Sequence, residues 1–143
     1  MDGIEQFANG EAAFASLQVP AWHRLGTVFE EALSTEEMLQ TANMANWDVR
    51  LVPAVQAHGD LLLEVPEKFT VLRNNPVSNS VDALSVVGTK YRPVQNEQLF
   101  GFGQSILDNA PEAVWETAGS IRQGRTVFGT LRLNGMDMLI NGV

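Results

Sequence analysis

The sequence predicts an α+β fold, in which a mostly antiparallel sheet of meanders and hairpins carries two main α-helices packed on one face. Three observations predict it. Short alternating strand patterns recur at regular spacing, turn residues separate them, and only two segments show a clear helical period. The chain has 143 residues, of which 45% are hydrophobic and 18% charged, a globular composition. This length predicts one domain over residues 1–143.

The N-terminal third precedes the predicted sheet. Residues 1–19 have a loose apolar rhythm broken by glycines, and residues 20–27 read as a loop, so we expect an irregular or short-helical arm over residues 1–33. The first clear helix begins after Ser34, because Ser34 and Glu37 have the spacing of a capping box. Asn46 is a plausible end, since asparagine tolerates a left-handed backbone. The predicted buried face of this helix consists of Met38, Leu39, Ala42 and Ala45.

A run of short strands follows. Residues 47–56 alternate as a strand that Pro53 interrupts, which favours an edge strand or a bulge. Residues 61–65 and 69–73 read as two strands joined by a turn, and 81–87 as a third. This spacing predicts an antiparallel meander.

The second predicted helix begins near Asn96, which we expect to be its cap, with Glu97 in the first turn where the helix dipole favours an acid. Gly101 and Gly103 weaken it by about 1 kcal/mol each relative to alanine, so we expect close packing there. The sequence leaves open which phenylalanine is buried; the predicted buried face is Leu99, Phe102 (or Phe100), Ile106 and Leu107.

The C-terminal third predicts a hairpin and one further strand. Residues 113–121 and 125–133 alternate on either side of a turn at 122–124, and residues 136–143 read as another strand. In the second strand of this hairpin, one face is shared by Val127, Gly129, Leu131 and Leu133. The last strand ends on apolar residues without a polar tail. We therefore expect the chain to be the N-terminal part of a longer protein.

Charge and composition exclude several classes of protein. The chain holds 17 acids and 9 Lys or Arg, a net charge of −8, which excludes a strongly basic nucleic-acid module but allows a local basic patch. The absence of cysteine excludes disulfide scaffolds and thiol nucleophiles. The acidic N-terminus and short apolar runs predict neither a signal peptide nor a membrane span. We expect a cytoplasmic protein.

No pattern in the sequence predicts catalysis. The two histidines, His23 and His58, lie far apart, and no motif adds metal ligands to them. The glycines at 101–103 fall inside a predicted helix, and residues 119–125 lack the ending of a phosphate-binding loop. We therefore predict a non-enzymatic protein with no catalytic residue, no cofactor and no metal.

Three clusters combine basic and aromatic residues and are candidate binding sites. Arg122 and Arg125 flank a glycine at the predicted hairpin turn, and such hairpins can track a nucleic-acid backbone. The alternatives are a solvated hairpin tip with ion pairs and, for Trp22, an anchor that fixes a loop to the core. The candidate residues are Trp22, His23 and Arg24, then Lys90, Tyr91 and Arg92, then Arg122, Arg125 and Arg132.

Three longer stretches carry a family resemblance. PAWHRLGT (20–27), VGTKYRPVQNEQLF (87–100) and ETAGSIRQGRTVFGTLRL (116–133) resemble, in order and spacing, the phage/plasmid-like protein family of unknown function. Members occur in actinobacterial phages, plasmids and laterally transferred islands, and they usually continue beyond the strand where this chain stops. The resemblance implies an α+β fold, a mobile-element origin and expression in the host cytoplasm, but no established activity.

Two functions remain open from the sequence. One is a nucleic-acid-associated accessory protein of the recombination or single-strand annealing type, whose partner is single-stranded nucleic acid. That likeness to annealing proteins is an analogy between folds. The other is a non-enzymatic protein-interaction module that acts on a host or phage protein. A homo-oligomer is compatible with both.

Overall fold

The structure, a computed structural model, describes residues 4–17, 27–29, 32–110, 112–133 and 136–142. The described elements in chain order are β1 (Phe14–Leu17), β2 (Thr27–Phe29), α1 (Thr35–Thr41), β3 (Arg50–His58), β4 (Leu61–Asn74), β5 (Val81–Val87), α2 (Asn96–Asn109), β6 (Val114–Ile121), the single 3₁₀ turn η1 (Arg122–Gly124), β7 (Thr126–Leu133) and β8 (Met136–Gly142).

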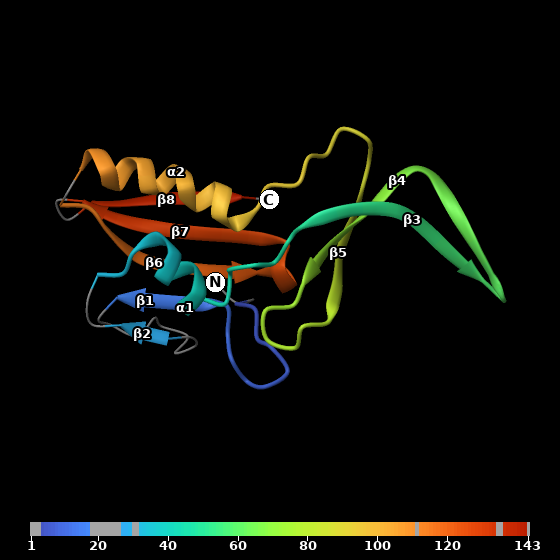
Figure 1. The fold of residues 1–143 in the computed structure, drawn as a ribbon, viewed down its shortest axis with the longest axis horizontal. Helices are drawn as coiled ribbons and strands as arrows, with labels where there is room; N and C mark the ends of the chain where they lie inside the picture. Colours follow the sequence, from blue (N-terminus) through green and yellow to red (C-terminus); the bar gives the residue numbers. More distant parts are fainter. Residues whose placement is uncertain (1–3, 18–26, 30–31, 111, 134–135, 143) are drawn as a thin grey trace.

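The strands form two sheets, which confirms the predicted α+β class. One sheet has five strands in the order β2-β1-β6-β7-β8, and the other has three in the order β3-β4-β5. Every pairing is antiparallel except that of β1 with β2. The predicted meander is therefore the smaller sheet, and the predicted hairpin is the centre of the larger one (Figure 1).

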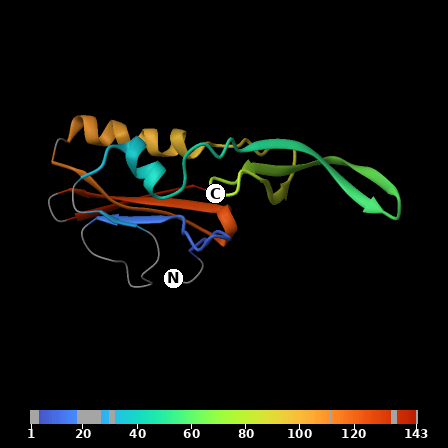
Figure 2. The same ribbon diagram turned by 60° about the horizontal axis from the view of Figure 1, so that its bottom comes forward.

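Both helices lie on the same face of the five-stranded sheet (Figure 2). Trp115 on β6 joins them: Phe100 of α2 stacks on its ring at a centroid distance of 4.9 Å, and its indole Nε1 donates to Thr35 Oγ1 of α1 at 2.8 Å. A side chain at Gly103 would overlap the Trp115 ring, whereas one at Gly101 would meet nothing. The predicted close packing is thus confirmed for Gly103 and wrong for Gly101.

The first helix begins as predicted and ends early. Ser34 and Glu37 form the capping box, with Glu37 N donating to Ser34 Oγ at 3.1 Å and Ser34 N to Glu37 Oε1 at 3.0 Å. The helix ends at Thr41 rather than near Asn46, because Asn43 already takes a left-handed backbone with a φ of 57°. Met38, Leu39 and Ala42 are buried as predicted.

The second helix starts at the predicted cap itself, one residue earlier than expected. Its N-cap is Gln95, whose backbone N–H donates to Gln98 Oε1 at 2.7 Å. Asn96 is instead buried and donates from its side chain to Met44 O at 2.8 Å. The phenylalanine left open by the sequence is decided by packing: Phe100 is fully buried, and Phe102 is 64% exposed.

Two further expectations are wrong. Part of the segment expected to be an irregular or short-helical arm forms β1, which pairs with both β2 and β6. The two strands expected at 61–65 and 69–73 are one continuous strand, β4, which accommodates Glu67 at a φ of 60°. Pro53 lies on the edge strand β3 beside a register shift, as its presence predicted.

Among the described residues, the base of the three-stranded sheet packs on the rest of the molecule. Val71 and Leu84 from β4 and β5 belong to the buried core that also contains Trp47 and Trp115. The far end of the β3–β4 hairpin extends away from the body in both views (Figures 1 and 2). The junction between the sheets therefore brings β5, the start of α2 and the β6–β7 turn together.

Candidate functional site

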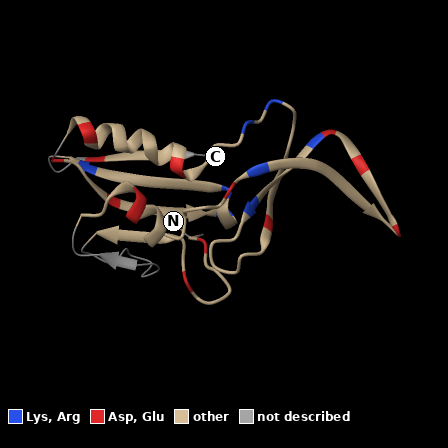
Figure 3. Ribbon diagram, viewed as in Figure 1, with Lys and Arg blue, Asp and Glu red and all other residues tan. Residues whose placement is uncertain are grey.

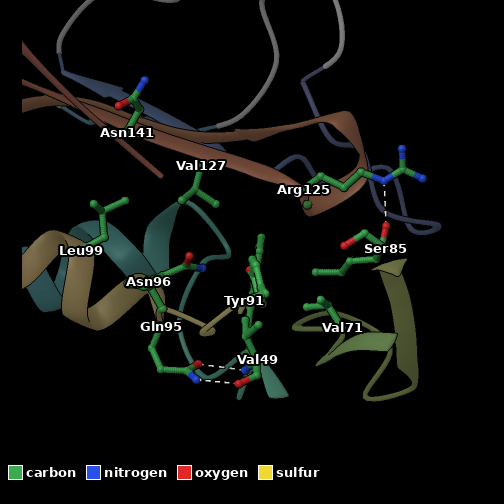
Figure 4. Close-up of a pocket in the computed structure, with 14 residues that line it drawn as sticks. Val49, Val71, Ser85, Tyr91, Gln95, Asn96, Leu99, Arg125, Val127 and Asn141 are labelled. Carbon is green, nitrogen blue, oxygen red and sulfur yellow. Dashed lines mark hydrogen bonds between the residues drawn. The ribbon is translucent and has the colours of Figure 1, made fainter. Parts of the chain in front are cut away.

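A pocket of about 350 Å³ opens at this junction, and we call it the waist pocket. Such a volume falls at the lower end of the roughly 300–1,000 Å³ typical of ligand sites. The walls come from the base of the small sheet, from the segment that leads into α2, and from β7 and β8 (Figure 4). Its lining is mostly apolar, with polar groups that include Tyr91, Arg125 and Asn141.

Arg125 lies at the edge of the waist pocket. Its Nε donates to the backbone carbonyl of Leu84 at 2.7 Å, a bond that ties the start of β7 to β5 (Figure 4). The side chain is otherwise exposed. A guanidinium has five N–H donors, so this single bond leaves donors that a ligand could use.

Tyr91 lines the same pocket from a separate segment. It lies between β5 and α2, is half-buried, and packs against the core. Its neighbours Lys90 and Arg92 are exposed. Arg92 donates from Nη1 to the carbonyls of Thr89 at 2.9 Å and Tyr91 at 3.0 Å, which holds its guanidinium against the loop.

The β6–β7 turn presents Arg122 next to Arg125. The backbone N–H of Arg125 donates to Arg122 O at 3.2 Å, closing a tight bend between two paired strands. Arg122, Gln123 and Gly124 all take a left-handed backbone, with φ of 54°, 57° and 89°. Both arginine side chains are exposed, and within the described residues neither has an ion pair with a carboxylate.

Arg132 does not belong to this cluster. It lies near the other end of β7, where its guanidinium forms ion pairs with Glu116 and, at 3.9 Å, with Asp137. Burial and the neighbouring Asp137 raise the pKa of Glu116, against the opposing charge of Arg132. The structure thus separates Arg132 from Arg122 and Arg125, with which the sequence grouped it.

The third predicted cluster, Trp22, His23 and Arg24, lies outside the described residues. Of the candidate residues that are described, two line the waist pocket, Tyr91 and Arg125. Lys90, Arg92 and Arg122 are exposed and lie one or two residues from lining residues in the sequence.

Sequence reasoning missed a buried ionic cluster directly behind the β6–β7 turn. Arg73 on β4 is buried, with 2% of its surface exposed. Its Nη1 donates to Glu5 Oε1 at 2.8 Å, and its Nη2 also pairs with Glu5. Its Nε donates to Asp82 Oδ2 at 3.0 Å. The buried Ser120 hydroxyl donates to Glu5 Oε1 at 3.0 Å. No sequence signal marks Arg73, because an arginine on a strand ordinarily points to solvent.

Aromatic rings and the turn complete the surroundings of Arg73. Its guanidinium carbon lies 4.4 Å from the Trp47 ring centroid and 5.6 Å from that of Phe7. Burial alone would lower the pKa of Arg73, but its hydrogen bonds and attraction to Glu5 and Asp82 outweigh burial and raise it. A side chain at Gly124 would overlap the Arg73 guanidinium. Arg73 thereby supports the turn that presents Arg122 and Arg125.

Other classes of site are not found in the described part of the chain. There, no three His, Cys, Asp or Glu side chains gather as a metal site would require. Neither described helix has the length and apolar character needed to cross a bilayer.

Comparison with known families adds one finding at this point. Residues 83–143 match a family described as a domain of unknown function (DUF932). The matched region covers less than half of the chain and includes Tyr91, the β6–β7 turn and β8. No curated protein and no solved structure matches the chain.

Proposed function

We propose that the waist binds single-stranded nucleic acid, and that the protein is a cytoplasmic accessory factor of a phage or plasmid, of the recombination or single-strand annealing type. The observation that carries the proposal is that Tyr91 and Arg125, from separate segments, line one open pocket. Lys90, Arg92 and Arg122 are exposed and lie one or two residues from lining residues in the sequence. The three stretches that resemble the phage/plasmid-like family support the mobile-element part.

The chemistry of these residues suits a single strand. Bases that are free of a duplex stack on aromatic rings, and guanidinium and ammonium groups contact the phosphates. The chain as a whole is acidic, so binding depends on this local concentration of charge. Several Lys and Arg positions lie near the junction of the two sheets, while Asp and Glu positions are scattered along the chain (Figure 3).

The decisive experiment measures the binding of a labelled oligothymidine of about 16 nucleotides by fluorescence anisotropy, between about 50 and 200 mM salt. Each phosphate contact contributes about −0.7 to the slope of log K against log salt for single strands. We expect the double substitution of Arg122→Ala and Arg125→Ala to weaken binding and to reduce the slope by about 1.4.

The matched control is Arg132→Ala, which removes an arginine on β7, the strand that follows the turn; Arg132 is paired with Glu116 and does not line the waist pocket. It should leave both affinity and slope unchanged. Tyr91→Ala should cost about 1–3 kcal/mol of binding, while Tyr91→Phe, which keeps the ring, should not. Absence of binding by the unmodified chain at about 50 mM salt, or equal losses for Arg132→Ala and the double variant, would overturn the proposal.

A protein-interaction module is the second candidate function. The observation that favours it is the extended β3–β4 hairpin, whose large apolar side chains are exposed. Capture of one host or phage protein with no nucleic acid, together with failure of the anisotropy experiment, would support this alternative.

A further inference from the structure

The outer part of the β3–β4 hairpin, residues 55–68, is a two-stranded ribbon that we call the β-arm. Strand β5 pairs with β4 only from Phe69 to Asn74, so in the described structure the β-arm has no third strand. Val55 to His58 pair with Glu64 to Leu61. A ribbon of two strands has no interior of its own and is at best marginally stable in water.

Both faces of the β-arm carry large apolar side chains. Side chains alternate along a strand, and residues directly opposite each other share a face. Leu61, Leu63 and Val65 therefore lie on one face, while Leu62 lies on the other with Val55. Leu62 is 74% exposed and Val55 56%. Contiguous apolar surface of this kind marks an interaction site, and here a partner has to cover it.

The charge of the β-arm indicates which kind of partner. Asp60, Glu64 and Glu67 outnumber the one base, Lys68, so the β-arm carries a net charge of −2. Two β-arms packed on each other would bring together two segments of net negative charge, which disfavours that pairing. A suitable partner surface is apolar and bordered by basic groups.

The waist has that combination. Its pocket is lined by apolar side chains such as Leu99 and Val127, and Val94 on its rim is 57% exposed. Arg125 lines it and supplies positive charge, and the exposed Lys90, Arg92 and Arg122 lie one or two residues from lining residues in the sequence. The β-arm points away from the waist of its own chain (Figures 1 and 2), so a waist that it reaches belongs to another molecule.

We propose that the β-arm of one copy docks on the waist of a second copy, and that nucleic acid competes with it for that site. The competition rests on the proposed function, whereas the docking itself does not. The contact joins two different surfaces, so repetition closes a ring or extends a filament. An acidic arm on a basic site would then keep the waist covered until a polyanion displaces it.

The test is the mass of the full chain by sedimentation velocity over a range of concentrations, without nucleic acid. We expect the average mass to rise above that of the monomer as concentration increases. The double variant Leu62→Ser with Leu63→Ser changes one residue on each face of the β-arm and should remain monomeric. The matched control is Val86→Ser on β5, which removes a side chain that is 62% exposed outside the β-arm and should associate like the unmodified chain.

A charge exchange tests the pairing of surfaces. Glu64→Lys with Glu67→Lys, and Arg122→Glu with Arg125→Glu, should each associate poorly alone, and their mixture should recover association. Circular dichroism of each variant excludes unfolding as the cause of a loss. A monomeric wild type, association of the Leu62→Ser and Leu63→Ser variant, or no recovery in the mixture would overturn the docking.

Further outcomes separate this inference from the proposed function. If the wild type associates through the β-arm and does not bind oligothymidine, the docking stands and the nucleic-acid proposal fails. If the wild type binds oligothymidine and stays monomeric, the nucleic-acid proposal stands and the docking fails. When the chain both associates and binds oligothymidine, added oligothymidine should lower the number of protein copies per complex. An unchanged number of copies would overturn the competition. Binding of the monomeric chain to vesicles of anionic phospholipid through the β-arm would assign the β-arm to a lipid surface and also overturn the docking.

Discussion

Replacement of Arg73 by leucine tests the buried ionic cluster that joins the N-terminal segment, the small sheet and the β6–β7 turn. The substitution leaves Glu5, 3% exposed, without its main partner and removes one contact of Asp82. Loss of one member of a buried pair costs about 3–5 kcal/mol, because the other charge stays buried and uncompensated. The loss of stacking on Trp47 acts in the same direction.

A loss of that size is a large part of the roughly 5–15 kcal/mol that stabilises a typical domain. Glu5→Gln should cost less than Arg73→Leu, because Arg73 keeps Asp82 at 3.0 Å. The double variant should lose less than the sum of the two single losses, since it leaves no unpaired charge from this pair.

The assay is urea unfolding at neutral pH, followed by tryptophan fluorescence, which reports on Trp47 next to Arg73. The matched control is Arg50→Leu, because Arg50 pairs with Asp48 at 3.5 Å near the surface, where 35% of the Arg50 side chain and 67% of the Asp48 side chain are exposed. Such pairs contribute about 0–1 kcal/mol. A loss for Arg73→Leu that is no larger than that for Arg50→Leu would refute the reasoning.

Two further predictions concern the turn and the first helix. Gly124→Ala should destabilise the fold by about 1–3 kcal/mol, because the φ of Gly124 is 89° and the added methyl would overlap Arg73. Gly101→Ala adds a methyl that meets nothing and should stabilise α2 by up to about 1 kcal/mol. Thermal unfolding compares the two variants, and equal effects on stability would contradict the packing described for Gly124. Ser34→Ala should cost about 1 kcal/mol. The Ser34 backbone and side-chain bonds lower the pKa of Glu37, so its stabilising effect is present above the ordinary pKa and is lost as pH falls through the lowered one. Glu37→Gln should remove that part of the pH dependence of the free energy of unfolding. The same pH dependence in the Glu37→Gln variant and the wild type would contradict this role of Glu37.

Local patterns predicted the elements whose conformation depends on neighbours in sequence. The capping box of Ser34 and Glu37 formed as expected, and so did the hairpin around residues 122–124. Pro53 identified an irregular edge strand because it lacks the N–H that a central strand requires. Arg122 and Arg125 are both exposed at this turn.

Contacts between distant residues decided the rest. Phe100 rather than Phe102 entered the core because Trp115 lies opposite it, and the helical period alone allowed either. Asn96 did not cap the helix because Met44 O, far away in sequence, offered its side chain a buried partner.

The sequence by itself determined the α+β class, the meander, the hairpin and the presence of basic residues near Tyr91. Only the tertiary structure decided that Tyr91 and Arg125 share a pocket, that Arg132 is ion-paired elsewhere, and that Arg73 is buried. The physical reason is the range of the forces involved. Caps, turns and strand alternation are set by residues a few positions apart, whereas burial and ion pairing depend on which surfaces the completed chain brings together.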